Sequence, residues 1–193
     1  MTRCSAILAP ALLAAVLAAC ASAPSRFYAL TSTAAGDGAA AVPVAVLVGP
    51  VTVPADVDRP EMVVQAAPNR VDVDEFNRWA APLGDAIARV VAGDLTVLLA
   101  TPDVATAPMA NFRADDRVTI NVQRFESLPG QFVLLDAVWT VQRVADGTTR
   151  SGRTTARESV AGDGYDALAA AHSRALARLS GDVADAIRVT NAR

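Results

Sequence analysis

The side chains best suited to nucleophilic or metal chemistry are few in this chain. It has one histidine, His172, and two cysteines, Cys4 and Cys20. A nucleophile needs a base beside it, and a transition-metal site needs several thiolate, imidazole or carboxylate ligands. His172 lies on an apolar stripe at helical spacing, where a lone histidine is more often a packed residue than a catalyst. We therefore expect no catalytic residue and no metal site.

The acidic residues form two close groups that could do acid–base work or hold a hard cation. Asp72, Asp74 and Glu75 make one group, and Asp115 and Asp116 make the other. Such groups are more often helix caps and solvated turns. The chain also lacks a Gly-x-Ser-x-Gly elbow, a Walker-type phosphate loop and a dinucleotide fingerprint. These observations predict a protein that is not an enzyme and needs no cofactor.

The N-terminus carries the most specific motif. A short positive segment is followed by an apolar run over residues 5–16 and then by Leu17-Ala18-Ala19-Cys20. The run suits an export signal and falls short of the ~20 residues that a membrane-spanning helix needs. Residues 17–20 resemble the bacterial lipobox, whose cysteine sulfur takes a diacylglyceryl group before cleavage. We predict that residues 1–19 are a lipoprotein signal peptide and that Cys20 is the lipidation site; an ordinary signal peptide ending near a cysteine is the alternative.

The residues around Cys20 also predict a location. Cys4 would leave with the leader and Cys20 would carry lipid, so no thiol remains for a disulfide. In lipoproteins an aspartate after the lipidated cysteine tends to retain the protein in the inner membrane, and here that residue is Ala21. We expect the periplasmic face of the outer membrane, with fatty acyl chains such as palmitate as the anchor, because two or more chains anchor stably.

The composition indicates a globular chain without an electrostatic footprint for nucleic acid. Of 193 residues, 52% are hydrophobic and 19% are charged, the net charge is −3, and all 17 basic residues are arginines. A mildly acidic chain without a basic run gives no reason to expect nucleic acid as a partner. We expect residues 20–43 to be a lipidated tether with a first short strand at 27–30, and residues 44–193 to be a single α+β periplasmic domain.

Hydrophobic periodicity predicts the strands that build this domain. The predicted strands cover residues 44–53, 61–65, 71–73, 117–127, 131–144 and 149–160. Pro50 cannot donate a ladder hydrogen bond, so it marks an edge or a bulge in the first of them. A Pro-Gly turn at Pro129-Gly130 closes the hairpin with the clearest alternation.

Two amphipathic helices are predicted beside these strands. Asp74 can cap a helix beginning at Glu75, and beyond Pro82 an apolar stripe at helical spacing continues to Leu98. The second helix covers residues 165–189. The predicted fold class is α+β: a largely antiparallel sheet with two amphipathic helices packed on one face, in the order β-β-β-α-β-β-β-α.

Some residues near the turns and the first helix are candidates for contact with a partner. They are Arg59, Asn69, Arg70, Arg78 and Trp79. The polar ones could orient loops or meet a partner, whereas a tryptophan in this setting is more typical of a core. The weakly apolar strand at 149–160 could also pair with a second copy, so a homo-oligomer is possible.

Several segments together resemble the ABC-type transport auxiliary lipoproteins, the PqiC-like family. The matching segments are Tyr28-Ala29-Leu30, residues 48–54, Asp58-Arg59-Pro60, Asn69-Arg70, Glu75-Phe76, residues 78–83, residues 173–176 and Leu179-Ser180. They span most of the chain after Cys20, in the family's order. Ala81 departs from the pattern, because the resemblance leads us to expect an acidic residue there.

The resemblance implies a non-enzymatic accessory subunit of an ABC-type lipid transport system whose substrate-binding part is an MCE-domain protein. Such a subunit would anchor or dock the MCE component at the outer membrane while ATP is hydrolysed elsewhere. The absence of a nucleotide motif in this sequence agrees with that division of labour. The alternative is a periplasmic lipid-binding carrier whose own groove takes an acyl chain, because apolar strands and two amphipathic helices could enclose one.

Overall fold

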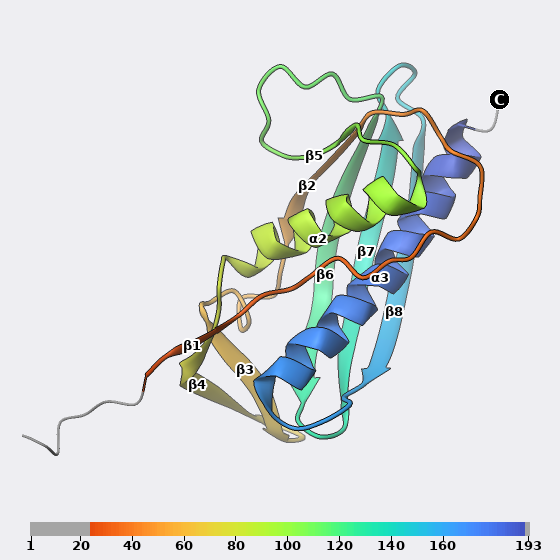
Figure 1. Cartoon of the computed structure of the whole chain (residues 1–193). Coiled ribbons are helices and arrows are strands. Elements are labelled where there is room, and N and C mark those ends of the chain that lie inside the picture. The colour runs from red at the N-terminus through yellow and green to blue at the C-terminus, as the bar shows by residue number, and fades with distance from the viewer. Residues whose placement is uncertain (1–23, 192–193) are drawn as a thin grey trace, which may run out of the picture.

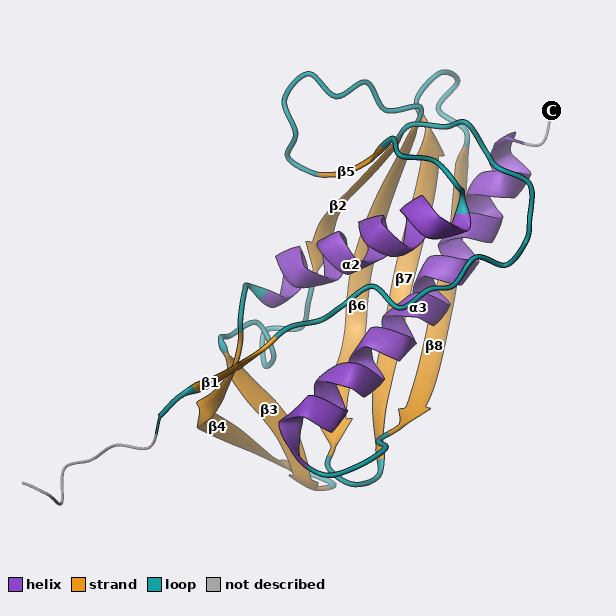
Figure 2. Ribbon diagram, in the orientation of Figure 1, coloured by secondary structure: helices purple, strands orange, loops and turns teal. Residues whose placement is uncertain are grey.

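The computed structural model describes residues 24–191, so the predicted leader and Cys20 lie outside the described residues. The elements in chain order are β1 (Arg26–Tyr28), β2 (Val46–Thr52), β3 (Glu61–Ala67), β4 (Arg70–Trp79), α2 (Leu83–Leu98), β5 (Val104–Thr106), β6 (Asp116–Leu128), β7 (Phe132–Arg143), β8 (Thr149–Ser159) and α3 (Gly164–Asn191). Both helices cover one face of a large sheet, and a small sheet lies at one end (Figures 1 and 2). The predicted α+β class is confirmed.

The large sheet has the strand order β5-β2-β6-β7-β8. Its β6, β7 and β8 strands pair antiparallel, with Leu128 opposite Phe132 across the predicted Pro-Gly turn. By contrast, β2 runs parallel to β5 and β6, because the small sheet and α2 intervene in the chain and allow it to re-enter in the same direction. The register of β2 against β6 shifts between Val48 and Val51, which confirms the bulge expected at Pro50. The short β5 strand was not predicted.

The core lies between the large sheet and the helices. The inward residues of β7 are Val133, Leu135, Ala137, Trp139 and Val141, and all are buried. The predicted apolar stripes of both helices are buried against them, apart from the half-buried Tyr165 at the start of α3. Helical and alternating periodicity therefore predicted this layer correctly, because one face of each element is removed from water.

The small sheet, with the order β1-β4-β3, corrects one prediction. The expected helix from Glu75 does not form, and β4 continues to Trp79. Asp74 nevertheless behaves as a cap, since its Oδ1 accepts the backbone N–H groups of Phe76 and Asn77 at 2.9 and 3.1 Å. The turn that it closes is a bulge in the β3–β4 ladder, whose register shifts at this point. The same side-chain chemistry serves a helix start or a bulge, and pairing with β3 decides between them.

Candidate functional site

Two of the predicted partner-contact residues meet on the small sheet. The Arg78 guanidinium lies 2.9 Å from the Glu61 carboxylate, and Arg59 lies 3.6 Å from the other oxygen of Glu61. Asn69 and Arg70 lie apart from this cluster, at the β3–β4 turn, where Arg70 approaches Asp72 at 3.9 Å. The side chains of Arg78, Arg59 and Arg70 are 37%, 46% and 70% exposed, so this end of the molecule offers polar groups to a partner.

The fifth candidate, Trp79, is only 6% exposed and lies in the core. Its ring makes edge contacts with Phe125 at 6.1 Å and with His172 at 6.2 Å between centroids. The core interpretation of this tryptophan is therefore confirmed, and little of the ring is left for a partner to touch. Together with Tyr28, Trp79 binds the small sheet to the large layer.

His172 is fully buried and stacks on Phe125 with 3.8 Å between ring centroids. Its Nε2 shares a hydrogen bond of 2.8 Å with Ser127 Oγ, and its Nδ1 has no hydrogen-bond partner among the described residues. Burial lowers the pKa of His172 to about 3, so the ring is neutral at physiological pH. A serine–histidine pair that is sealed from water and lacks an orienting group on Nδ1 is a structural contact.

A chain of hydrogen bonds ties β1 and β4 to the start of α3. Tyr28 donates to Asn77 Oδ1 at 2.6 Å, Asn77 donates to Asp74 Oδ2 at 2.9 Å, and Tyr165 donates to the same oxygen at 2.8 Å. Burial alone would raise the pKa of Asp74, but the hydrogen bonds outweigh it and hold that pKa below its usual value. Burial and the bond to Asp74 raise the pKa of Tyr165. We call these four residues the latch.

The segment after β1, residues 31–42, is held in an extended path across the helices, and we call it the strap. Its main anchor is Asp94 of α2, a buried carboxylate whose Oδ1 accepts Ser32 Oγ at 2.6 Å and the N–H groups of Thr33 and Ala34 at 3.0 and 2.9 Å. Its Oδ2 accepts Ser180 Oγ of α3 at 3.0 Å. One aspartate thus joins the strap to both helices.

Further contacts fix the start and the middle of the strap. Thr31 N–H donates to Ser173 Oγ at 3.1 Å, and Asp37 pairs with Arg188 of α3 at 2.8 Å. A Cβ added at Gly93 would stand 3.1 Å from the Cβ of Ser32, so the glycine allows the strap to cross α2 closely. The later part of the predicted tether is therefore fixed on the domain, because buried side chains of both helices satisfy its backbone.

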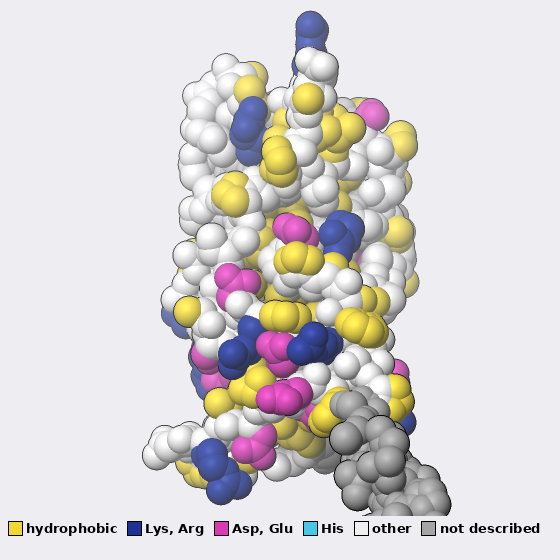
Figure 3. All heavy atoms as spheres, turned by 90° about the vertical axis from the view of Figure 1, so that its left-hand side faces the viewer, with side chains coloured by type: hydrophobic (Ala, Val, Ile, Leu, Met, Phe, Trp, Pro, Cys, Tyr) yellow, Lys and Arg dark blue, Asp and Glu magenta, His cyan; other side chains and the backbone are white. Residues whose placement is uncertain are grey.

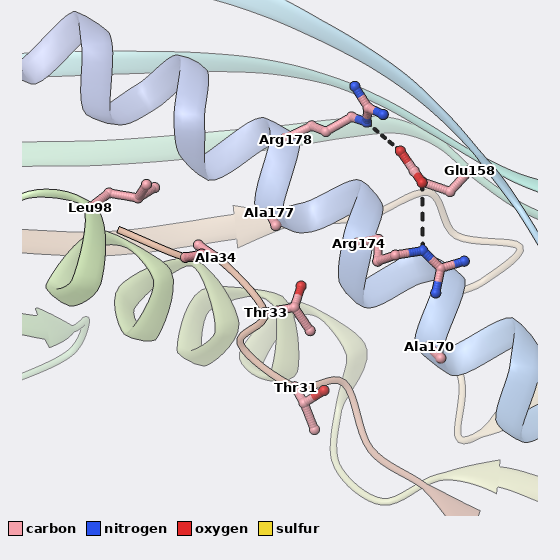
Figure 4. A pocket seen from close by; sticks show the side chains of 10 residues that line it. Thr31, Thr33, Ala34, Leu98, Glu158, Ala170, Arg174, Ala177 and Arg178 are labelled. Atoms are coloured by element: carbon pink, nitrogen blue, oxygen red, sulfur yellow. Dashed lines mark hydrogen bonds and ion pairs between the residues drawn. The ribbon is translucent and has the colours of Figure 1, made fainter. Parts of the chain in front are cut away.

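An open groove runs beside the strap, between the end of α2 and one face of α3 (Figure 4). Its volume is about 650 Å³, and small side chains such as Ala34, Ala170 and Ala177 form its floor. Arg174 and Arg178 stand along α3, and both pair with Glu158 of β8 (Figure 4).

The second acidic group is structural. Asp115 accepts the Ala45 N–H at 2.9 Å, and Asp116 is buried and accepts Asn191 Nδ2 at 2.6 Å. Burial raises the pKa of Asp116. Asp116 is therefore not the solvated turn residue that we expected, because Asn191 of α3 packs over it. Within residues 24–191 no cluster of three or more histidine, cysteine or acidic residues could hold a metal, and no helix is long and apolar enough to cross a membrane.

The residues that hold the strap are not among the predicted site residues, although the sequence carries a signal for them. Asp94 interrupts the apolar stripe of α2 between Val91 and Leu98, where a charge needs partners. Ser173 and Ser180 are seven residues apart on α3, which places them two turns apart on one face. A buried aspartate on one helix and two serines on one face of the other predict polar links, but sequence spacing alone does not say which segment they bind.

The fold is known from other proteins. The chain matches a crystal structure of an uncharacterized protein with a TM-score of 0.68 at 20% identity, over 86% of this chain and 99% of that one. It also matches a Xanthomonas campestris protein of the DUF330 family with a TM-score of 0.66 at 22% identity, over 82% and 92% of the two chains. PelC from Paraburkholderia phytofirmans is more distant, at 14% identity and a TM-score of 0.43 over 73% of this chain and 88% of that one. No curated protein matches significantly.

The first two likenesses show that this fold, a two-layer α+β domain with a second small sheet, is shared with solved structures. Residues 28–184 match the family described as the ABC-type transport auxiliary lipoprotein component. The match begins at Tyr28 of the latch and runs into α3, so it includes the strap, both sheets and α2. The chain therefore belongs to this family of transport auxiliary lipoproteins, and the predicted resemblance is confirmed.

Proposed function

We propose that this chain is a non-enzymatic auxiliary lipoprotein that anchors or docks the MCE component of an ABC-type lipid transporter at the periplasmic face of the outer membrane. The family match over residues 28–184 is the observation that carries the proposal. The sequence adds the lipobox at 17–20 and the Ala21 that follows the proposed lipidation site. The latch and strap support a tether role, because they join the segment after Cys20 to both helices.

The mechanism that we propose is tethering. Acyl chains on Cys20 hold the domain to one leaflet, and two or more chains are enough for stable anchoring. Arg59, Asn69, Arg70 and Arg78 are the proposed partner contacts, because their polar groups are offered to solvent on the small sheet and at its turn. The energy for transport comes from the ATPase of the partner system.

Partner capture tests this proposal. The full-length protein, solubilised from membranes after crosslinking, should co-purify with an MCE-domain protein and its ABC permease. A double variant, Arg59→Ala with Arg70→Ala, should reduce that capture while leaving the thermal unfolding midpoint close to that of the wild type. The absence of any MCE protein after crosslinking would reject the proposed partner.

The proposed anchor is tested separately by two cysteine variants. Cys20→Ala should remove the acyl mass from the mature protein and abolish transport, while the domain stays folded. Cys4→Ala is the matched control, because the leader would carry that residue away. Full transport activity from the unlipidated Cys20→Ala protein would rule out the tether mechanism.

The groove beside the strap favours one second candidate, a periplasmic lipid-binding carrier. Its volume of about 650 Å³ is within the usual range for ligand sites, its floor is apolar, and arginines line its edge. Native mass spectrometry of the protein purified without detergent would decide between the candidates. Bound phospholipid that is lost in an Ala177→Trp variant would support the carrier, and a lipid-free protein would remove it.

A further inference from the structure

Exposed apolar side chains gather on β1 and β4 of the small sheet. The fractional exposure is 65% for Phe27, 52% for Val71, 41% for Phe76 and 39% for Val73. These are the only exposed phenylalanines among residues 24–191, and both lie in this short stretch of sheet. Figure 3 views this side of the molecule and shows hydrophobic side chains between acidic and basic ones. Apolar side chains gathered in this way indicate an interaction surface.

The register of the strands places most of these residues on one face. Phe27 pairs with Arg78, and Arg78 pairs with Glu61, whose side chains meet at 2.9 Å and so share a face. Val63 follows Glu61 by two residues and pairs with Val73. The members of this outer face are Phe27, Glu61, Val63, Gln65, Val71, Val73 and Arg78. At one edge of the face, Val63, Gln65 and Val71 line a small hollow against β6. The opposite face carries the buried Tyr28, Met62 and Val64.

The covalent path to the proposed lipid limits where this face can be. Phe27 is seven residues after Cys20, and seven extended residues span at most about 24 Å. After β1 the strap leads across both helices, so β1 is the first element that follows Cys20 among the described residues (Figure 1). Acyl chains on Cys20 would therefore hold the outer face within reach of the bilayer surface.

We propose that the outer face of the small sheet, with Phe76, rests on the surface of the phospholipid bilayer. This inference depends on the proposed lipid anchor at Cys20. Phe27 and Phe76 enter the interfacial region, where aromatic side chains are favoured, and Val71 and Val73 extend the apolar contact. Arg59 and Arg78 share the single carboxylate of Glu61, so this group of three side chains carries one net positive charge beside Phe27.

This orientation separates the two ends of the molecule. The small sheet and β1 lie at one end, and the long loop after β5 and the C-terminus lie at the other (Figure 1). With the small sheet on the bilayer, the loop of residues 107–115 and the turn between β7 and β8 point away from the membrane. The proposed partner contacts Arg59, Asn69, Arg70 and Arg78 lie at the membrane end, so the MCE component would meet this domain beside the bilayer.

Single cysteine variants can test the orientation, because the lipidated mature chain would have no free thiol of its own. We would label Phe27→Cys and Val73→Cys with an environment-sensitive fluorophore in the lipidated protein and place it on phosphatidylethanolamine–phosphatidylglycerol vesicles that carry a nitroxide near the headgroup. Val189→Cys is the matched control, because Val189 is 56% exposed at the far end of α3. Quenching should be roughly five-fold stronger at 27 and 73 than at 189, since only an inserted or surface-bound probe meets the nitroxide.

Intact mass of the purified protein separates failure of this inference from failure of the proposed function. A protein without acyl chains on Cys20 would overturn both. An acylated protein whose probes at 27 and 73 are quenched no more than the probe at 189 would overturn the membrane-facing orientation and leave the tether intact. A probe at 27 that responds only when the MCE partner is added would show that the face binds protein instead, and would also overturn the inference.

Discussion

The large sheet with its helices and the small sheet with β1 are held by different forces. In the large layer, whole stripes of both helices pack against the inward residues of β6 and β7, and most of these side chains have no contact with water. The small sheet buries one face only and exposes Phe27, Val71 and Val73 on the other. Its attachment depends on the latch and on the packing of Trp79. Apolar burial therefore holds the large layer together, while a few polar links position the small sheet, the part nearest the proposed anchor.

The largest effect is expected from crowding the large layer. Gly152 of β8 pairs with Trp139 of β7, and a Cβ at Gly152 would stand 2.2 Å from Cζ2 of that ring. Gly152→Ala must displace the indole and break its hydrogen bond of 3.0 Å to Thr154. We expect a loss of about 3 kcal/mol in the free energy of unfolding, measured with urea.

A glycine in α3 provides the control for that variant. A Cβ at Gly181 would have no heavy atom within 4 Å, so Gly181→Ala should stabilise the helix by up to about 1 kcal/mol. If Gly152→Ala were as stable as the wild type, the large layer would not be the tightly packed part of the molecule.

The next largest effect should come from releasing the strap. Asp94→Ala removes the acceptor for Ser32, for two strap N–H groups and for Ser180. We expect a loss of about 2 kcal/mol, because the strap can detach and regain hydrogen bonds to water. Hydrogen exchange should accelerate at Thr33 and Ala34 but not in β7.

The control for the strap variant is Asp85→Ala, which removes an exposed carboxylate from the first turn of the same helix. It should change stability by less than about 0.5 kcal/mol. Unchanged exchange at Thr33 and Ala34 in Asp94→Ala would mean that Asp94 does not hold the strap.

His172, which contacts Trp79 of the small sheet, makes the junction of the two regions sensitive to acid. The pKa of His172 is about 3 in the folded chain, below its ordinary value of 6.5. Between pH 3 and pH 6.5 the imidazole is therefore protonated in the unfolded chain but neutral in the folded one. Stability should therefore be complete above pH 6.5 and fall as the pH drops below it, by at most about 1.4 kcal/mol per pH unit. His172→Gln should remove this slope, and urea titrations at several pH values would measure the difference. An identical slope in both proteins would contradict the assignment.

The smallest effect is expected in the latch. Tyr165→Phe removes the hydrogen bond of 2.8 Å to Asp74 and leaves the ring packed 5.8 Å from that of Tyr28. We expect a loss of about 1 kcal/mol. Hydrogen exchange in β1 and β4 should report it more clearly than global unfolding does. Protection lost equally in β7 would show that the small sheet and the large layer unfold as one unit.

The same contrast explains how much could be predicted from the sequence. The β6–β7 hairpin and both helical stripes were predicted because period-two and period-3.6 patterns report burial on one face. The helix expected at Glu75 was wrong because Asp74 caps a bulge with the same hydrogen bonds that it would give a helix. Strand pairing with β3, a contact between distant segments, decided the outcome, and local patterns do not contain that information.

The candidate site was predicted less completely than the fold. Arg59 and Arg78 were named from their place near turns, but their shared partner Glu61 depends on the β3–β4 register. The role of Asp94 could not be predicted, since two of its hydrogen-bond donors are backbone N–H groups of a segment without hydrophobic periodicity. Polar links between distant segments depend on the assembled fold, whereas the periodicity of each element already indicates which of its faces is buried.

The arrangement of β1 and the strap has a mechanical consequence. Any tension on the chain before Arg26 enters the fold along β1, which lies parallel to β4 and is paired with it from Arg26 to Tyr28. That load acts along the strands as shear. The force that the β1–β4 pairing does not bear acts next on the hydrogen bonds between the strap and Asp94. Asp94 also holds Ser180, so the remaining force is divided between α2 and α3. A pull on the proposed anchor would therefore load the β1–β4 pairing first, the strap bonds at Asp94 next and the core last.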